Sequence, residues 1–271
     1  MLHHVLHPTD DPAIELAARY AAAEQPCAPM RAADGPPAVL YLHGFGSSQD
    51  GDKAVAMRQA FGAAGAAFAS LDVRGHGAST GALRTLTLTR ALADVEIALA
   101  DLRARGHRRP ILFGSSMGGL LALWTAARRP DAVAAVLGLA PAIDMLATLE
   151  KRLGPDGMAA WQADGWTTLE TTLTRTPMDW PMVEDLRRYD LSALIDALEV
   201  PVFLLQGAHD DSVDRSAVID FALACRPPVE LHLFGDGDHR LLDHLAALPA
   251  LCLTFLRTRG LLAAAPSAAA P

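Results

Sequence analysis

From residue 38 onward the sequence alternates between short apolar runs and longer amphipathic stretches. This rhythm is typical of parallel strands joined by helices, because each crossover between parallel strands needs a dozen residues or more. We expect an α/β fold with a mostly parallel central sheet, helices on both of its faces and a small cap insertion. The expected strands are 38–42, 66–72, 110–114, 132–139, 201–206 and 229–234, and the expected helices are 53–63, 88–105, 117–129, 191–198, 214–225 and 239–257.

Two segments depart from this rhythm. Residues 1–37 contain two stretches of weak alternation, 2–7 and 14–20, which predict two antiparallel edge strands, and then a proline-rich loop. Residues 142–190 form an insertion after the fourth expected strand and hold three of the four Trp and four of the eight Met. The insertion leaves the sheet at its carboxyl edge, where α/β sheets bind ligands. Its large apolar residues are Trp161, Trp166, Trp180, Met145, Met158, Met178 and Met182.

The chain therefore divides into three parts. The core consists of residues 1–141 and 191–260, and residues 142–190 are the cap. Residues 261–271 are expected to form a flexible tail. A chain of 271 residues lies within the range that one large α/β domain fills, so no second core is needed.

Composition and charge exclude several classes of function. The formal net charge is −8, whereas binding to nucleic acid requires a positive surface. No apolar stretch approaches the roughly 20 residues that span a bilayer. The N-terminus shows neither the basic nor the apolar part of a secretory signal, so we expect a cytoplasmic protein. The cysteines have no metal-binding or redox spacing and are expected to be plain thiols: Cys27, Cys225 and Cys252.

The strongest motif is a G-x-S-x-G pattern in residues 114–119, Gly-Ser-Ser-Met-Gly-Gly. It lies between an expected strand and an expected helix. A serine on such a tight turn is held outward as a nucleophile, and small neighbours let the backbone close around it. Ser116 is the candidate nucleophile, because Ser116, unlike Ser115, has glycine two positions before and after it. The alternative role for this serine is that of a helix N-cap.

A serine hydroxyl needs a base that removes its proton and a third group that orients the base. Asp210 follows the fifth expected strand and His239 follows the sixth, so the order Ser116, Asp210, His239 is that of a hydrolase triad. Asp211 is the alternative acid. The other histidines considered are expected to be structural or exposed: His3, His4, His7, His107, His209, His232 and His244.

Acyl transfer also needs two N–H donors for the negative oxygen that develops on the substrate. Residues 43–48, His-Gly-Phe-Gly-Ser-Ser, form a glycine-rich turn after the first central strand, and such a turn can direct a backbone N–H into the site. The expected oxyanion-hole donors are the N–H groups of Phe45 and Met117. Residues 72–77 lie on the neighbouring loop and are expected mainly to hold the site loops in place.

These elements together are far more specific than any one of them. From about residue 38 to 257 the chain resembles the α/β-hydrolase superfamily and, within it, the palmitoyl-protein thioesterase branch that also cleaves acyl glucuronides. The resemblance implies an α/β-hydrolase fold and thioesterase or carboxylesterase activity, with Ser116, Asp210 and His239 at the triad positions. The motifs that carry it are Gly-Asp-Lys-Ala at 51–54, the turn at 114–119, Arg-Pro-Asp-Ala-Val at 129–133, Asp210-Asp211 and Asp-His-Arg at 238–240.

The expected function is that of a cofactor-free serine hydrolase that cleaves carboxylic esters or thioesters. Its partner would be a small-molecule substrate or an acylated protein, and no metal ion or organic cofactor is expected. Two alternatives stay open: the same triad acting on a peptide, lactone or carbon–carbon bond, and a homologue that only binds a ligand. We also expect the Trp and Met residues of the cap to select an apolar acyl group, unless they form the cap's own small core.

Overall fold

The computed structural model describes residues 1–24, 34–171, 174–226 and 229–263. Cys27, the prolines at positions 26 and 29 and most of the expected tail lie outside these residues. The strands are β1 Leu2–Leu6, β2 Leu16–Ala21, β3 Ala38–Leu42, β4 Ala67–Leu71, β5 Ile111–Ser115, β6 Ala135–Leu139, β7 Trp166–Glu170, β8 Arg175–Asp179, β9 Val202–Gly207 and β10 Val229–Phe234. The helices are α1 Asp52–Ala63, α2 Leu88–Ala104, α3 Met117–Arg128, α4 Met145–Asp164, α5 Pro181–Leu186, α6 Leu191–Ala197, α7 Arg215–Ala224 and α8 Leu248–Thr258.

The central sheet has eight strands in the order β1-β2-β4-β3-β5-β6-β9-β10. The strands from β4 to β10 in this order run parallel, and β1 and β2 add antiparallel at the β4 edge. The predicted mostly parallel sheet and its two edge strands are thereby confirmed. The strand order reverses at β3, whose neighbours are β4 and β5. Such a reversal opens a crevice at the carboxyl ends of the strands, where open α/β sheets bind their ligands.

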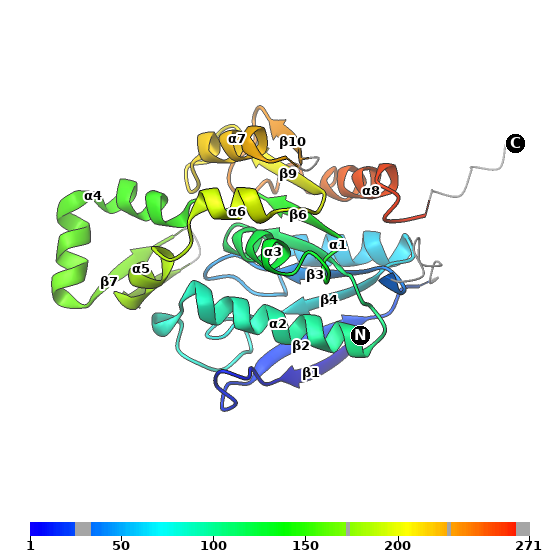
Figure 1. Ribbon diagram of the computed structural model, residues 1–271, viewed down its shortest axis with the longest axis horizontal. Helices are drawn as coiled ribbons and strands as arrows, with labels where there is room; N and C mark the ends of the chain where they lie inside the picture. Colours follow the sequence, from blue (N-terminus) through cyan, green and yellow to red (C-terminus); the bar gives the residue numbers. More distant parts are fainter. Residues whose placement is uncertain (25–33, 172–173, 227–228, 264–271) are drawn as a thin grey trace, which may run out of the picture.

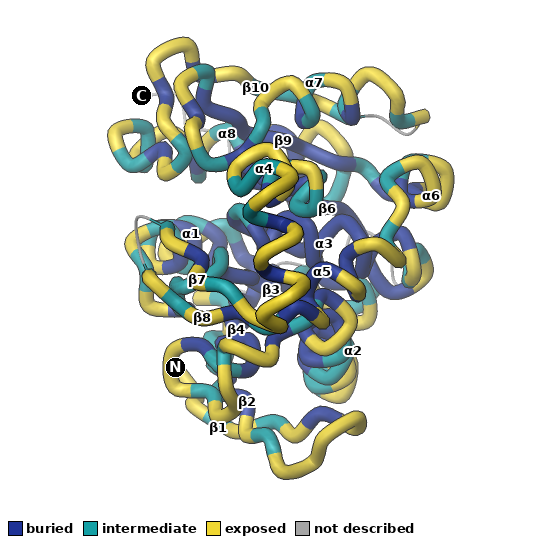
Figure 2. The backbone as a smooth tube through the Cα atoms, turned by 90° about the vertical axis from the view of Figure 1, so that its left-hand side faces the viewer, coloured by how far each residue is buried: buried dark blue, intermediate teal, exposed yellow. Residues whose placement is uncertain are grey.

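Helices cover both faces of the sheet. On β3, Leu40 and Leu42 belong to the core beneath α2, α3 and α7, whereas Val39 and Tyr41 belong to the core beneath α1 and α8. Figure 2 shows these central strands as buried. Strands that are buried on both faces read as continuous apolar runs, which is why the sequence of the central strands shows no alternation.

One predicted boundary is wrong by more than two turns. The helix expected at 239–257 begins only at Leu248, and the residues before it form turns, in which the N–H of Leu241 donates to Oδ1 of Asp238 at 2.6 Å. Pro249 stands in the first turn of α8. Proline is tolerated there but breaks a helix when it lies in the interior, so the helix starts at this point.

The insertion of residues 142–190 contains α4, the antiparallel pair β7 and β8, and α5. α4 bends at Gly154, where φ is 66° and the next residue is Pro155. Figure 1 shows the insertion at one end of the sheet and α8 at the other. Figure 2 looks onto the insertion's end, and α4 crosses in front of the central strands. The insertion therefore stands where a cap would, and the division into core and cap stays a prediction.

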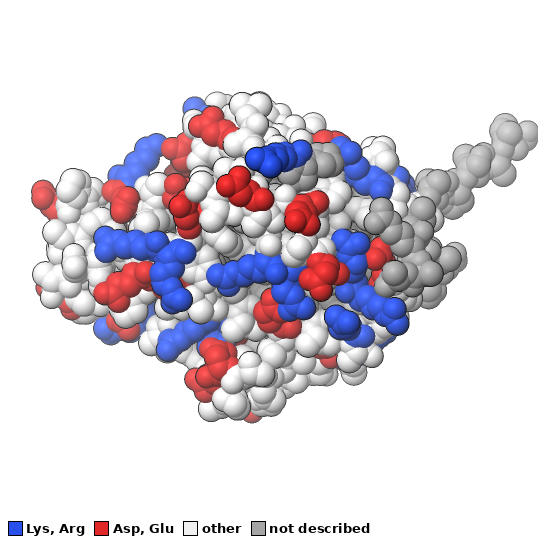
Figure 3. All heavy atoms as spheres, in the orientation of Figure 1, with Lys and Arg blue, Asp and Glu red and all other residues white. Residues whose placement is uncertain are grey.

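The surface carries charges of both signs. On the face shown in Figure 3, Lys and Arg side chains are interspersed with Asp and Glu side chains. A nucleic-acid footprint would instead gather basic side chains into a patch or stripe. Among the helices that the structure describes, none has the length and apolar character needed to cross a membrane.

Candidate active site

Ser116 occupies the sharp turn between β5 and α3, with φ 54° and ψ −117°. A positive φ costs a residue with a Cβ about 1–3 kcal/mol and persists where the surroundings fix it. Here the N–H of Ser116 donates to the carbonyl of Leu139 at 2.9 Å, and its carbonyl accepts from the N–H of Ala142 at 3.1 Å. The turn is thereby tied to the carboxyl end of β6. Ser116 is the N-cap residue of α3 by position, but its hydroxyl makes no capping hydrogen bond to the helix.

The glycines of the motif stand where the chain passes too close for a side chain. A Cβ on Gly114 would lie 2.1 Å from the carbonyl oxygen of Gly118, and a Cβ on Gly118 would lie 2.1 Å from the carbonyl oxygen of Leu42. Gly44 approaches the nucleophile candidate itself, since its Cβ would lie 3.3 Å from the Cβ of Ser116. The loop after β3 therefore lies directly against Ser116.

The structure brings His239 and Asp210 together. The Nδ1–H of His239 donates to Oδ2 of Asp210 at 2.9 Å, and Asp210 is only 6% exposed. The carboxylate also accepts from Nε2 of Gln206 at 2.8 Å and from the N–H groups of Ser212 and Val213 at 2.9 Å. Burial raises the pKa of Asp210, but His239 and these donors more than offset burial and hold the pKa below its usual value. Asp210 is therefore ionised at neutral pH.

The alternative acid makes a different contact. Asp211 is exposed, and its Oδ1 accepts from the hydroxyl of Ser212 at 3.0 Å. His209 lies in the same loop, where its backbone N–H donates to the carbonyl of Gly237 at 2.8 Å. This bond ties the loop after β9 to the loop after β10. Asp210 is thus the residue of the acidic pair that meets His239.

The expected oxyanion-hole donors lie on two sides of Ser116. Phe45, on the loop after β3, lines the same cavity as Ser116, and Met117 is the first residue of α3. The first N–H groups of a helix have no partner within it. In the part of the chain that the structure describes, the N–H groups of Phe45 and Met117 form no hydrogen bond. Both are therefore available to a bound substrate.

Residues 72–77 hold the neighbouring loops, as expected. Oδ1 of Asp72 accepts from the backbone N–H of Gln49 at 2.7 Å, which links the loop after β4 to the loop after β3. Nη2 of Arg74 donates to Oδ1 of the buried Asp94 on α2 at 2.6 Å. Within the described chain, none of the residues that line the cavity comes from 72–77.

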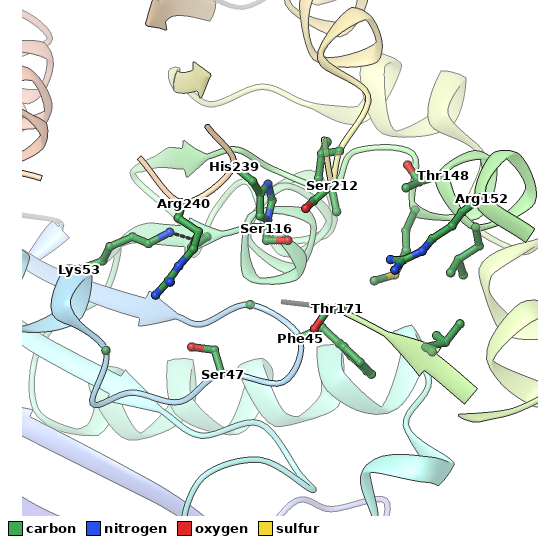
Figure 4. Close-up of a pocket in the computed structure, with 18 of the residues that line it drawn as sticks. Phe45, Ser47, Lys53, Ser116, Thr148, Arg152, Thr171, Ser212, His239 and Arg240 are labelled. Atoms are coloured by element: carbon green, nitrogen blue, oxygen red, sulfur yellow. Dashed lines mark hydrogen bonds between the residues drawn. The ribbon is translucent and has the colours of Figure 1, made fainter. Parts of the chain in front are cut away.

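Ser116 and His239 line one cavity of about 270 Å³, shown in Figure 4. One side of it is formed by the loop after β3, the start of α1 and the loop after β10. The other side comes from the insertion, with residues from α4, β7 and α5. A concave, mostly apolar site with a few convergent polar groups is the usual form of a small-molecule site. The apolar residues that the insertion contributes include Met145, Leu149, Leu169 and Met182.

The Trp and Met residues of the insertion have two separate roles. Met145 lines the cavity. Trp161, Trp180 and Met178 form the insertion's own core: the two indole rings meet edge to face with centroids 5.8 Å apart, and Nε1–H of Trp161 donates to the carbonyl of Met178 at 3.0 Å. The described residues that line the cavity do not include these three. The expectation that Met178 and Trp180 contact the acyl group is therefore wrong.

Three cations line the cavity: Lys53, Arg152 and Arg240. Lys53 and Arg240 stand in two of the motifs that carry the family resemblance, at 51–54 and 238–240, but the sequence predicts no role for any of the three. Nζ of Lys53 donates to Oγ of Ser115 at 3.0 Å, and the guanidinium of Arg152 donates to the carbonyl of Glu170. Burial, together with the positive charge of Arg240, lowers the pKa of Lys53 to about 8. Sequence spacing does not predict that the three cations line one cavity, because they come from α1, α4 and the loop after β10.

Comparison with known proteins identifies the family. Over residues 36–177 the chain matches the family described as serine aminopeptidase, S33. It is 31% identical over 209 residues to the mitochondrial palmitoyl-protein thioesterase ABHD10 of Mus musculus. The aligned residues cover 76% of this chain and 69% of that protein. The chain belongs to the α/β-hydrolase family. The resemblance inferred from the motifs is confirmed, and the protein is a hydrolase enzyme. The Homo sapiens ABHD10 is 28% identical, over 76% of this chain and 67% of its own.

Solved structures of other α/β-hydrolases share the fold. A putative hydrolase from Agrobacterium vitis superimposes with a TM-score of 0.79 at 26% identity, covering 93% of this chain and 98% of that one. Est1E from Butyrivibrio proteoclasticus with bound ferulic acid gives a TM-score of 0.79 at 20% identity, over 94% of this chain and 98% of its own. The mouse α/β-hydrolase domain-containing protein 10 gives 0.76 at 24% identity, over 96% and 100%. The structures of Est1E and of the mouse protein are 20% and 24% identical in sequence to this chain, so the comparison with them supports the fold alone.

Proposed function

We propose that this enzyme hydrolyses carboxylic esters or thioesters through an acyl-enzyme formed on Ser116. One observation carries the proposal: Ser116 and His239 line the same cavity, and Nδ1 of His239 lies 2.9 Å from the buried carboxylate of Asp210. A serine with a base beside it, and an acid behind the base, is the arrangement that activates a hydroxyl as a nucleophile.

The reaction begins when His239 takes the proton of the Ser116 hydroxyl while its oxygen attacks the acyl carbon. Asp210 holds the imidazole with its hydrogen on Nδ1 and stabilises the charged ring. Negative charge moves to the carbonyl oxygen, where the N–H groups of Phe45 and Met117 stabilise it. The alcohol or thiol then leaves with the proton from His239. Water attacks the acyl-enzyme by the same route and releases the carboxylic acid.

The insertion's side of the cavity is the proposed acyl site. Met145, Leu149 and Leu169 are apolar, and each CH₂ buried against such residues contributes up to about 0.8 kcal/mol. The relatives named palmitoyl-protein thioesterase support an acyl substrate and favour a thioester. We propose a small molecule or an acylated protein as the substrate. The cytoplasmic location stays a prediction, since the names of those relatives place them in mitochondria.

A peptide substrate is the second candidate, because the family that matches residues 36–177 is described as a serine aminopeptidase. The fold and the triad do not by themselves decide which acyl bond is cleaved. Attack on an amide would use the same residues, with an amine as the leaving group. The remaining alternatives, lactone or carbon–carbon bond cleavage and ligand binding without turnover, rest on no contact of the described residues.

The test is hydrolysis by the purified enzyme of acyl esters and acyl thioesters from acetyl to hexadecanoyl, with aminoacyl anilides in parallel. We expect turnover of esters and thioesters, and loss of it in Ser116→Ala with the fold retained. Turnover of the anilides alone would transfer the proposal to peptide bonds. If no acyl substrate is cleaved and a fluorophosphonate does not label the protein, the enzyme assignment to these residues is wrong.

A further inference from the structure

Lys53 lines the cavity from the first turn of α1. Its Nζ donates to Oγ of Ser115 at 3.0 Å, the bond drawn in Figure 4. Ser115 is 5% exposed at the end of β5 and immediately precedes Ser116. The contact holds the ammonium at the residue next to the proposed nucleophile, in a cavity that Lys53, Ser115 and Ser116 all line.

The hydrogen-bond partner of this ammonium is a hydroxyl and not a carboxylate. Within the described residues Lys53 forms no ion pair, and a hydroxyl partner carries no charge. The positive charge of Arg240, on the loop after β10, repels it, while the carboxylates of Asp238 and Asp210 attract it more weakly than burial disfavours its charge. Asp52, its neighbour on α1, is exposed and also lines the cavity. Burial is the largest influence and lowers the pKa of Lys53 to about 8, so the group is still charged at neutral pH.

We propose that the ammonium of Lys53, placed by Ser115, supplies positive charge to the oxygen that becomes negative during acyl transfer. The inference rests on the proposed function. A fixed cation in a partly dry cavity stabilises charge that develops in the transition state more than it stabilises the neutral carbonyl.

A desolvated cation whose partner is a neutral hydroxyl costs stability, so a structural role does not account for it. If Lys53 acts through its charge, its effect must disappear when the amine loses its proton. Arginine keeps the positive charge at every pH in the working range, whereas methionine keeps the length of the stem without the charge. These two replacements therefore separate the charge from the packing.

The test compares wild type, Lys53→Met and Lys53→Arg on an uncharged butanoyl ester between pH 5 and 10, with Lys151→Met as the control. Lys151 is exposed on α4 and pairs with Asp214. We expect kcat/KM of the wild type to fall above a midpoint near pH 8, toward the value of Lys53→Met. Lys53→Met should be about tenfold or more slower at pH 7 and lack this alkaline limb. Lys53→Arg should recover most of the rate and keep it to pH 10.

Three outcomes would overturn the inference. One is a rate for Lys53→Met within twofold of the wild type at pH 7. Another is an alkaline limb that persists unchanged in Lys53→Arg, since the titrating group would then be elsewhere. The third is a loss of activity in Lys53→Met that accompanies a lowered melting temperature, which would assign Lys53 a packing role. Failure of the proposed function looks different, because the wild type itself would then not cleave the ester at any pH.

Discussion

Gly118 packs so closely on Leu42 that a Cβ at position 118 would lie 2.1 Å from the Leu42 carbonyl oxygen. This contact joins the first turn of α3 to the end of β3, and so places the nucleophile turn against the loop that carries Phe45. The spacing of the G-x-S-x-G motif thus has a steric cause in this chain. The turn therefore depends on the glycines of the motif as well as on its serine.

The first prediction follows from that contact. Gly118→Ala should separate α3 from β3, lower the melting temperature by several degrees and abolish ester hydrolysis. The new Cβ would clash with backbone atoms of β3, which cannot move aside without shifting the strand. Gly235→Ala is the control, since a Cβ at Gly235 meets nothing within 4 Å. Thermal unfolding and ester turnover check both variants. A fully active Gly118→Ala would contradict the packing described for the turn.

The second prediction separates the two neighbouring acids. Asp210→Asn should lower kcat by about 10³–10⁴-fold, because the amide no longer holds His239 in the required tautomer. Asp211→Asn should change kcat less than threefold, since Asp211 is exposed and bonds Ser212. Steady-state kinetics of the two variants decide the matter. Equal losses would mean that the carboxylates exchange roles.

The third prediction concerns stability and pH. The pKa of Lys53 is lowered from 10.5 to about 8, so the folded state loses this proton more readily than the unfolded state. The charged lysine therefore destabilises the fold below pH 8, and the penalty disappears as pH rises toward 10.5. Lys53→Met should be more stable than wild type at pH 7, by up to roughly 3 kcal/mol. Denaturant melts at pH 7 and pH 10 measure this difference; a gain that is equal at both would contradict the assignment.

The fourth prediction distinguishes the two groups of apolar residues in the insertion. Met145→Ala should flatten the preference for longer acyl chains and leave acetyl ester hydrolysis nearly unchanged, because Met145 lines the cavity. Met178→Ala should instead cost about 2–5 kcal/mol of stability, because the Met178 side chain is fully buried in the hydrophobic core. A chain-length series of esters and thermal unfolding, applied to both variants, test this division. Equal losses on every substrate in Met145→Ala would remove the acyl role.

The sequence predicted the sheet, its edge strands and the meeting of Asp210 with His239, because those features follow from local patterns. Apolar runs specify buried parallel strands, and chain order places the loops after β9 and β10 at one edge. The start of α8 is predicted too early, because the leucines before Leu248 recur at the spacing of an amphipathic helix. Pro249 was the available signal for the correct boundary.

The cations of the cavity could not be predicted in the same way. Lys53 and Ser115 are 62 residues apart in the sequence. They come into contact because α1 and β5 converge at the crevice beside β3. Composition could not divide the cap residues either. A buried Trp such as Trp161 and a cavity-lining Met such as Met145 are equally apolar, and their places depend on how α4 and β8 pack.

The central claim is an acyl-enzyme on Ser116, and the most direct measurement is mass spectrometry of the enzyme quenched during turnover of a slow acyl ester. We predict a mass increase equal to the acyl group on the peptide that holds residues 115 and 116, present in Ser115→Ala and absent in Ser116→Ala. An adduct that persists in Ser116→Ala, or ester turnover by that variant at the wild-type rate, would contradict the account.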